Sequence, residues 1–398
     1  MWINRKLENQ ILKIVNFMPS VYLSGPRQVG KTSLVRKIFP DFSYISFDLP
    51  SIAERAEKNP DLFFGQIKEN VILDEIQYVP SLFRYLKYEI DSQKGKKFIL
   101  TGSQKFLMIK NITDSLAGRC AIIDLLGLSY FEIKEKVEEN VSNKEIDELD
   151  FIIKGGYPFL WVEKNISPNI FYSNYLITYI ERDIRSLINI GKVRDFERFI
   201  RSLAIRVGQL LNFSDLARDV GISVSTAREW TSILEASNQL FLMEPYFRNI
   251  GKRIIKSPKI YFTDTGFLCY LLGIESKDDL LNSIYLGNIW ENFIINEVLK
   301  LFSFNLIKPT VWFFRDKDAL EVDLIIELNG KINIYDIKFT ENPDKNDIKS
   351  IKKTISFFDE KQINKAGIIC RTLHEYEIDK NIFGLKINHL KELLEKKL

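Results

Sequence analysis

Short apolar runs alternate with amphipathic segments over the first 135 residues of the chain. "KTSLVRKIF" (31–39) places Leu34, Val35 and Ile38 at helical spacing and predicts a helix. Continuous apolar runs predict buried strands at "SVYLS" (20–24), "YISFDLP" (44–50), "VILDEIQ" (71–77) and "KKFILTGSQ" (96–104). Strands that alternate with helices indicate a parallel α/β sheet, which binds its ligand at the carboxyl edge of the strands.

The middle of the chain is predicted to be helical and charged from residue 136 to 200, and then to form a winged helix over residues 201–275. In this second part, Ala217 and Gly221 lie four residues apart, as the close packing and the turn of a helix-turn-helix require. Ser223 is placed to cap the second helix. The stretch "LFLMEPYFRNIGKRIIKSPKIYFTD" (240–264) follows and predicts a β-hairpin.

The last segment, residues 276–398, combines an amphipathic helix with two strands. "GNIWENFIINEVLKLF" (287–302) has the periodicity of the helix. "ALEVDLIIEL" (319–328) and "KINIYDIKFT" (331–340) have that of the strands. Three domain boundaries are therefore predicted, at 135/136, 200/201 and 275/276.

The composition is that of an ordinary globular protein and changes this picture little. The chain has 398 residues, of which 45% are hydrophobic and 27% charged. No secretory leader and no apolar run long enough for a membrane span are readable, so the cytoplasm is the expected compartment and no membrane partner is expected. The three cysteines form no close pair that would indicate structural zinc. The net charge of +3 is too small to indicate nucleic acid by itself, so only local clusters can argue for it.

The loop after the first predicted strand carries the most specific chemistry in the sequence. Gly25 and Gly30 frame the pattern G-x-x-x-x-G-K-T, the P-loop, whose glycines let backbone N–H groups close around phosphates. Lys31 is expected to reach the β- and γ-phosphates, and Thr32 to bind Mg²⁺ through its hydroxyl. The predicted nucleotide contacts are Gly25, Pro26, Gln28, Val29, Gly30, Lys31, Thr32, Ser33, Asp74 and Ser103.

Acidic residues at the end of a second strand predict hydrolysis. Asp74 is expected to contact Mg²⁺ through water, and Glu75, one residue further, to orient or deprotonate the attacking water. At the end of the next strand, Thr101 or Ser103 is expected to touch the γ-phosphate or the water, and the sequence leaves both open. Arg119 is a candidate for stabilising the charge of the γ-phosphate, in cis or from a neighbouring subunit, and the second case would require a homo-oligomer.

These motifs together resemble a known family. "GPRQVGKTSL", "VILDEIQ", "ILTGSQ", "SLAGR" and "LGLSYFE", in this order, are similar to AAA-type P-loop ATPases of archaea and bacteria with a C-terminal region of unknown function. The similarity continues through "GGYP" (155–158) and "YLITYIERDI" (175–184), so it covers nearly the whole chain. The resemblance implies an N-terminal ATPase that uses ATP and Mg²⁺, followed by a winged helix and a nuclease-like domain.

Basic residues around the predicted winged helix favour duplex DNA as a partner. Arg248, Lys252, Arg253, Lys256 and Lys259 occur with no acidic residue between Arg248 and Phe262. Such a cluster beside a recognition helix is typical of phosphate contact. The residues predicted to bind DNA are Ser225, Thr226 and Arg228 on the helix and Lys252, Arg253 and Lys256 on the hairpin. The alternative is a module that connects proteins and has no affinity for DNA.

Four residues of the last segment suggest a metal site. Glu291, Asp323, Asp336 and Lys338 resemble the signature of restriction-endonuclease-like nucleases, with three acids for Mg²⁺ and a lysine that polarises water. Relatives with this ATPase architecture more often have glutamate at the position of Asp336. The alternative is an ordinary charged hairpin. The function predicted from the whole sequence is an ATP-hydrolysing ATPase that acts on DNA, and the second hypothesis is a nucleotide-gated switch that contacts proteins without cleaving DNA.

Overall fold

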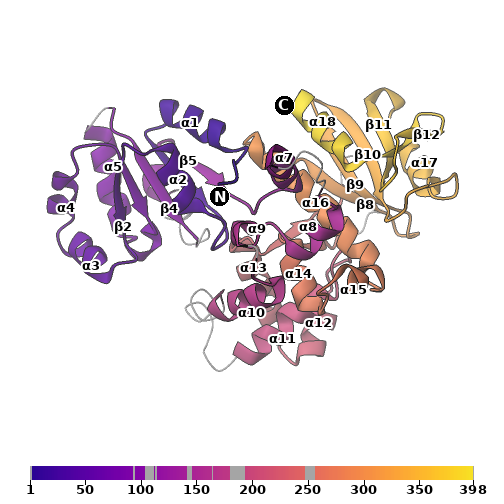
Figure 1. Ribbon diagram of the computed structural model, residues 1–398, viewed down its shortest axis with the longest axis horizontal. Helices are drawn as coiled ribbons and strands as arrows, with labels where there is room; N and C mark the ends of the chain where they lie inside the picture. The colour runs from indigo at the N-terminus through magenta and orange to yellow at the C-terminus, as the bar shows by residue number, and fades with distance from the viewer. Residues whose placement is uncertain are drawn as a thin grey trace. The chain divides into compact units, whose positions relative to one another are not determined.

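The computed structural model describes residues 2–92, 95–103, 112, 114–140, 146–163, 165–179, 193–246 and 256–397. Contacts divide the chain into two compact units (Figure 1). The first comprises Met1–Lys144, Tyr157–Asn165 and Ala236–Gln239, and the second comprises Glu145–Gly156, Ile166–Glu235 and Leu240–Leu398. This division does not test the three predicted domain boundaries, which stay predictions.

The first unit contains a parallel sheet of five strands in the order β2-β3-β4-β1-β5. The strands are β1 (Ser20–Ser24), β2 (Ser43–Ser46), β3 (Val71–Asp74), β4 (Phe98–Gly102) and β5 (Cys120–Asp124). The predicted parallel sheet is confirmed, and β5 is a strand that the sequence pattern did not reveal. Ser24 pairs in register with both Gly102 and Asp124, so the ends of β1, β4 and β5 meet at one edge.

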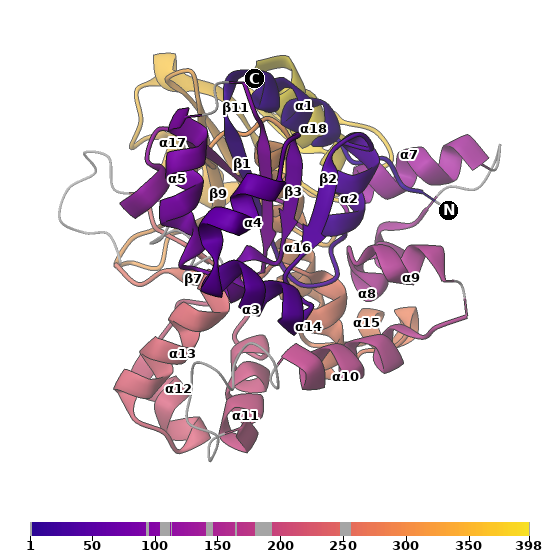
Figure 2. The same ribbon diagram turned by 90° about the vertical axis from the view of Figure 1, so that its left-hand side faces the viewer.

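Helices cover both faces of this sheet (Figure 2). On one face the side chains of Tyr22, Leu73 and Leu100 pack with Phe64 and Leu86 in a buried core. These two residues come from helices that lie in front of the sheet in Figure 2. The helices of this unit are α1 (Glu8–Phe17), α2 (Lys31–Ile38), α3 (Pro50–Lys58), α4 (Pro60–Gln66), η1 (Ile76–Tyr78), α5 (Leu82–Ser92), α7 (Tyr130–Asn140) and α9 (Pro158–Val162).

The second unit begins with a helical region. Its elements are α8 (Glu148–Lys154), α10 (Pro168–Tyr179), α11 (Val193–Ala204), α12 (Phe213–Val220), α13 (Val224–Ala236), β6 (Leu240–Met243), β7 (Lys259–Phe262), α14 (Thr265–Leu272) and α15 (Lys277–Leu281). Strands β6 and β7 pair antiparallel, as the predicted hairpin requires. The side chain of Asp264, between β7 and α14, accepts hydrogen bonds from the Tyr172 hydroxyl at 2.7 Å and the Gly156 N–H at 2.7 Å.

A mixed sheet of six strands completes the second unit, in the order β12-β13-β11-β10-β9-β8. Strands β8 to β10 are antiparallel neighbours, whereas β10, β11 and β13 run parallel. The elements are α16 (Leu286–Phe304), β8 (Val311–Arg315), β9 (Glu321–Leu328), β10 (Lys331–Ile337), α17 (Lys349–Ile355), η5 (Glu360–Gln362), β11 (Ile363–Ile369), β12 (Tyr376–Asp379), β13 (Ile382–Leu385) and α18 (Ile387–Lys397). The predicted helix and two strands are present, and the restriction-endonuclease-like fold stays a prediction.

Over the described ranges, no helix has both the length and the apolar character that crossing a membrane requires.

Candidate functional site

The loop between β1 and α2 has the backbone shape that a phosphate cradle needs. Gly25 has a φ of 148°, and a Cβ atom there would lie 2.1 Å from the carbonyl oxygen of Leu125. Only glycine therefore fits beside the end of β5. Gln28 and Gly30 also have positive φ values, 62° and 92°. Helix α2 begins directly after them, so its unpaired N–H groups point toward the loop.

Lys31 lies in the first turn of α2 and is buried, with 6% of its surface exposed. Its Nζ donates hydrogen bonds to the carbonyl oxygens of Gly25 at 2.9 Å and Pro26 at 2.8 Å. The ammonium group is thus held inside the curve of the loop, where a phosphate would meet it.

Asp74 is the centre of a hydrogen-bond network at the end of β3. Its carboxylate accepts hydrogen bonds from the hydroxyl groups of Thr32 at 2.8 Å and Tyr44 at 2.7 Å, and from that of Thr101. The two predicted Mg²⁺ ligands, Thr32 and Asp74, are therefore in direct contact. Carboxylate and hydroxyl oxygens beside phosphates are the ligands that Mg²⁺ uses in nucleotide sites.

Tyr44 was missed by the sequence analysis. It belongs to β2, the strand next to β3, and burial and the hydrogen bond to Asp74 raise its pKa to about 12. The hydroxyl consequently keeps its proton and donates to the carboxylate. The guanidinium carbon of Arg36 lies 4.8 Å from the centre of the tyrosine ring. An aromatic residue near the end of a strand gives no local signal of such a contact.

Glu75 follows Asp74 in a left-handed conformation, with a φ of 56°. This conformation is uncommon for a residue with a side chain, and it turns the chain sharply into η1. The Glu75 N–H donates to the Thr101 hydroxyl at 3.2 Å, and the Gln77 side-chain amide donates to the Glu75 carboxylate. The glutamate is therefore oriented by two neighbours at the edge of the sheet.

The structure distinguishes between Thr101 and Ser103. The Thr101 hydroxyl is engaged with Asp74 and with the Glu75 backbone. The Ser103 hydroxyl is buried and has no hydrogen-bond partner among the described residues. Ser103 directly follows Gly102, the register partner of Ser24, so it lies at the edge from which the loop leaves. Its unsatisfied hydroxyl fits a polar ligand, and the residues around the loop fit a phosphate chain with Mg²⁺.

Three family models match the chain. Residues 18–134 match an AAA domain. Residues 146–278 match the domain of unknown function DUF8612, and residues 286–390 match the domain of unknown function DUF4143. The uncharacterized protein Rv2008c of Mycobacterium tuberculosis is 30% identical over 328 residues, which are 82% of this chain and 71% of that protein. The chain belongs to this family of AAA-domain P-loop ATPases.

A further relative and two solved structures are similar to this chain at lower sequence identity. The uncharacterized protein MJ1544 of Methanocaldococcus jannaschii is 26% identical over 381 residues, covering 89% of this chain and 81% of that protein. A Walker-type ATPase of Pyrococcus abyssi is 16% identical with a TM-score of 0.48, covering 68% of this chain and 96% of that one. The ORC2 protein of Aeropyrum pernix, in its ADP form, is 13% identical with a TM-score of 0.33, covering 61% of this chain and 87% of that one.

Arg119 of this P-loop ATPase lies away from the loop. It precedes β5, and its carbonyl oxygen accepts the N–H of Ser20 at 3.1 Å, at the amino edge of the sheet. Its guanidinium pairs with the Asp91 carboxylate at 2.6 and 3.0 Å. The length of β1, about 13 Å from Ser20 to Ser24 at 3.3 Å per residue, separates it from the start of the loop. A role of Arg119 toward a phosphate bound in its own subunit is thus inconsistent with the structure, and only the role in a neighbouring subunit stays a prediction.

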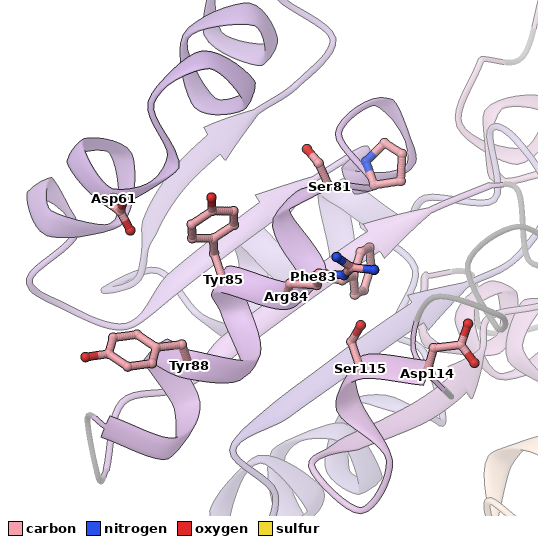
Figure 3. A pocket seen from close by; sticks show the side chains of 9 residues that line it. Asp61, Ser81, Phe83, Arg84, Tyr85, Tyr88, Asp114 and Ser115 are labelled. Carbon is pink, nitrogen blue, oxygen red and sulfur yellow. The ribbon is translucent and has the colours of Figure 1, made fainter.

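A pocket of about 820 Å³ lies elsewhere in the first unit (Figure 3). Tyr85 and Tyr88 from α5 face it in Figure 3, with Asp61 from α4 across the opening. The other lining residues are Pro80, Ser81, Phe83, Arg84, Asp114 and Ser115. None of the predicted nucleotide contacts lines this pocket.

Helices α12 and α13 have the caps of a helix-turn-helix. Gly221 ends α12 in a left-handed conformation, with a φ of 80°. The Ser223 hydroxyl accepts the N–H of Thr226 at 3.1 Å and so caps α13, as predicted. Ser225 and Arg228 are exposed on α13, Thr226 is partly exposed, and the Arg228 guanidinium lies 4.4 Å from the ring centre of Phe213.

The basic residues of the predicted hairpin differ in whether the structure describes them and in whether they are exposed or buried. Lys256 is described and exposed. Arg248, Lys252 and Arg253 lie outside the described residues. Lys259 is buried on β7, so its prediction as a phosphate contact is wrong. Its Nζ lies 3.0 Å from Glu291 Oε1, 2.5 Å from Glu321 Oε1 and 3.2 Å from Asp323 Oδ1. Strand β7 places the Lys259 side chain in the interior of the second unit, where it is shielded from solvent.

The four residues predicted to form a nuclease site are placed near one another, although the ammonium of Lys338, whose charge lowers the pKa of Asp336, is paired with another acid. Glu291 on α16 and Asp323 on β9 share Lys259, and the Ile337 N–H donates to the second oxygen of Asp323 at 3.0 Å. Asp336 is buried at the end of β10. Lys338 instead pairs with Asp347 at 2.8 Å.

The electrostatics of this cluster are those of buried acids around an ammonium group. Burial and the neighbouring Asp323 raise the pKa of Glu291 to about 7, and the same two causes raise the pKa of Asp336 well above its usual range. Burial lowers the pKa of Lys259, but the charges of Tyr261, Glu291 and Asp323 outweigh it and hold that pKa above its ordinary value. Over the described ranges, no three histidine, cysteine or acidic side chains are arranged to hold a metal ion. The residues present therefore do not fit the predicted Mg²⁺ site.

Proposed function

We propose that this AAA-domain protein binds ATP with Mg²⁺ and hydrolyses it, and that the hydrolysis serves an action on duplex DNA. The observation that carries the first part is the contact of Thr32 with Asp74 at 2.8 Å, beside a buried Lys31 and an oriented Glu75. These residues come from the loop, from α2 and from the end of β3, and they meet at one edge of the sheet.

Each of these groups has a distinct task in hydrolysis. The N–H groups of the loop and the start of α2 bind the phosphate chain, and Lys31 neutralises charge on its outer phosphates. Thr32 and Asp74 would hold Mg²⁺, which neutralises charge that develops on the phosphates. Glu75 orients the attacking water and accepts its proton. The Ser103 hydroxyl, which has no hydrogen-bond partner in the described part of the chain, supplies a hydrogen bond to the γ-phosphate or to that water.

Two substitutions test the ATPase proposal. Lys31→Ala should abolish ATP binding, because the loop then has no ammonium group inside its curve to offset the phosphate charge. Glu75→Gln should leave ATP binding intact and stop turnover, since the amide cannot accept the proton. Binding is measured by the fluorescence of a labelled ATP analogue, and turnover by steady-state phosphate release.

The matched control is Glu69→Gln, which makes the same change at an exposed glutamate of the same unit and should leave both measurements unchanged. Normal turnover by Glu75→Gln would remove the role in water activation.

The DNA part of the proposal is supported by the capped pair of α12 and α13. The exposed residues Ser225 and Arg228 on α13 and the exposed Lys256 of the basic stretch are polar and positive groups available to a ligand. A helix of this kind enters the major groove, and positive residues beside it bind phosphates. A labelled duplex should therefore bind with an affinity that falls steeply as salt rises, and it should stimulate ATP hydrolysis.

Arg228→Ala should weaken the binding of duplex, whereas Arg198→Ala, at an exposed arginine on α11, should not. The second candidate function, a nucleotide-gated switch that contacts proteins, predicts no duplex affinity at any salt concentration. Duplex that neither binds nor changes turnover would favour that second function and leave the ATPase proposal standing.

A further inference from the structure

Lys259 sits at the centre of three carboxylates in the second unit. An ammonium group has three N–H donors, and Glu291, Glu321 and Asp323 each present one oxygen within 3.2 Å of Nζ. Only 3% of the lysine side chain is exposed. The number of donors equals the number of acceptors, so the hydrogen-bonding capacity of the ammonium is filled.

Two of the three remaining oxygens are also engaged, those of Asp323 and Glu321, and the oxygen of Glu291 that faces Lys259 has a second partner. The second oxygen of Asp323 accepts the N–H of Ile337 at 3.0 Å. Glu291 Oε1 also accepts the Tyr261 hydroxyl at 2.5 Å. The second oxygen of Glu321 pairs with the guanidinium of Arg315 at 2.5 Å. Two cations of the chain thus face the three acids, and the carboxylates are already oriented toward them.

The backbone fixes the lysine in this position. Lys259 pairs with Met243 in the β6–β7 ladder, and it forms an isolated bridge with Leu210. Its Nζ also lies 5.6 Å from the ring centre of Phe313 on β8. The ammonium therefore belongs to a strand held on several sides, and leaving the carboxylates would require that strand to move.

We propose that the Lys259 ammonium is the resident cation of this cluster and takes the place that a divalent metal ion would occupy between Glu291 and Asp323. The cluster is then a metal-independent centre that joins β7 to α16 and β9. It does not activate water for cleavage of phosphodiesters, although the sequence carries acids and a lysine in the order of a nuclease. This inference concerns the second unit alone and stands apart from the proposed ATPase.

The first experiment asks whether the native protein binds Mn²⁺ at this cluster. The nucleotide-free protein is titrated with Mn²⁺, and free Mn²⁺ is counted by electron paramagnetic resonance. Asp74→Asn is present in every sample to remove the acid of the nucleotide site. The protein with Asp323 intact and the Asp323→Asn protein should bind the same number of ions. One additional Mn²⁺ bound when Asp323 is intact would overturn the proposal.

The second experiment removes the ammonium. Lys259→Met keeps an unbranched side chain but leaves the buried Glu291 and the partly buried Glu321 and Asp323 without their cation. The melting temperature of this variant should fall, and Mn²⁺ should raise it again while leaving that of the wild type unchanged. Lys256→Met, an exposed lysine on the same segment, is the matched control and should melt as the wild type does, with or without Mn²⁺.

Two outcomes of the second experiment would contradict the proposal. If Lys259→Met melts at the wild-type temperature, the carboxylates do not depend on the ammonium. If Mn²⁺ does not stabilise the variant, the ammonium does not occupy a cation site. If Lys259→Met fails to fold, the first experiment still tests the proposal, because it counts the Mn²⁺ ions bound by protein that retains Lys259. Neither experiment involves ATP or DNA, so its failure is distinguishable from failure of the proposed function.

Discussion

Arg5 connects the nucleotide loop to the rest of the first unit. Its Nε donates to the Glu132 carboxylate at 3.2 Å, and one terminal nitrogen donates to the carbonyl oxygen of Val29 in the loop at 3.2 Å. The other terminal nitrogen donates to the carbonyl oxygens of Leu126 at 2.7 Å and Gly127 at 3.3 Å. The side chains of Arg5 and Glu132 are 5% and 0% exposed.

Replacement of Arg5 by methionine should therefore destabilise the first unit. Removing one partner of a buried ion pair costs about 3–5 kcal/mol, because the other charge stays buried without compensation. Glu132 would keep two donors, the N–H groups of Lys6 and Ser129, each at 2.8 Å. We therefore expect the lower end of that range, about 3 kcal/mol. The loss of the bond to Val29 should also weaken ATP binding, because the loop is then less constrained.

Lys6→Met is the matched control, since it is the next residue along the chain and also belongs to an ion pair. The ammonium of Lys6 lies 2.6 Å from Glu135, but the two side chains are 31% and 42% exposed. An exposed pair contributes about 0–1 kcal/mol. Both variants remove a positive charge from an ion pair, so the difference between their losses in free energy of unfolding reports the effect of burial.

The assay is urea unfolding followed by circular dichroism. The transition of the first unit is identified as the one that added nucleotide shifts to higher urea, because a ligand stabilises the state that it binds. If Arg5→Met lowers the free energy of unfolding no more than Lys6→Met does, the reasoning about the buried pair is refuted.

Three further substitutions test the geometry of the first unit. Gly25→Ala should abolish ATP binding, because the new Cβ would lie 2.1 Å from the carbonyl oxygen of Leu125; wild-type affinity in the labelled-nucleotide assay would refute this. Tyr44→Phe should raise the Mg²⁺ concentration that half-saturates ATP hydrolysis by about tenfold, as for other groups that orient a metal ligand, and an unchanged Mg²⁺ dependence would show that Asp74 does not need the tyrosine. Arg119→Ala should leave the hydrolysis rate of dilute protein unchanged, because the arginine lies at the opposite edge of the sheet; a loss of rate at that dilution would contradict its placement.

Local signals along the sequence were sufficient to predict the nucleotide loop and four of the five strands of its sheet, all but β5. The conformation of the loop depends on Gly25 and Gly30, which differ from other residues in their backbone freedom. The sequence position of Asp74 and Glu75 at the end of an apolar run predicted their place at the sheet edge. In each case, the residues that determine the feature lie within a few positions of one another.

The partners of polar side chains depended on the tertiary structure. Tyr44 reaches Asp74 because β2 pairs with β3, and Arg5 reaches Glu132 across 127 positions of sequence. Arg119 follows a glycine turn, a position that is common for surface arginines and that also left a catalytic role open, and β5 places it at the amino edge of the sheet. No pattern of neighbouring residues contains this information, because it depends on which strands and helices pack together.

Lys259 is the clearest case in which the sequence pattern did not predict the partners of a charged side chain. In the sequence it ends a basic stretch, which predicts contact with solvent or phosphate. In the structure its three carboxylate partners come from positions 32, 62 and 64 residues further along the chain. The sequence by itself determined the nucleotide loop and the strand ends that carry Asp74 and Thr101, since these depend on local backbone preference and on hydrophobic periodicity. Only the folded chain decided which charges are buried together, because burial and ion pairing arise when distant segments exclude water from the same space.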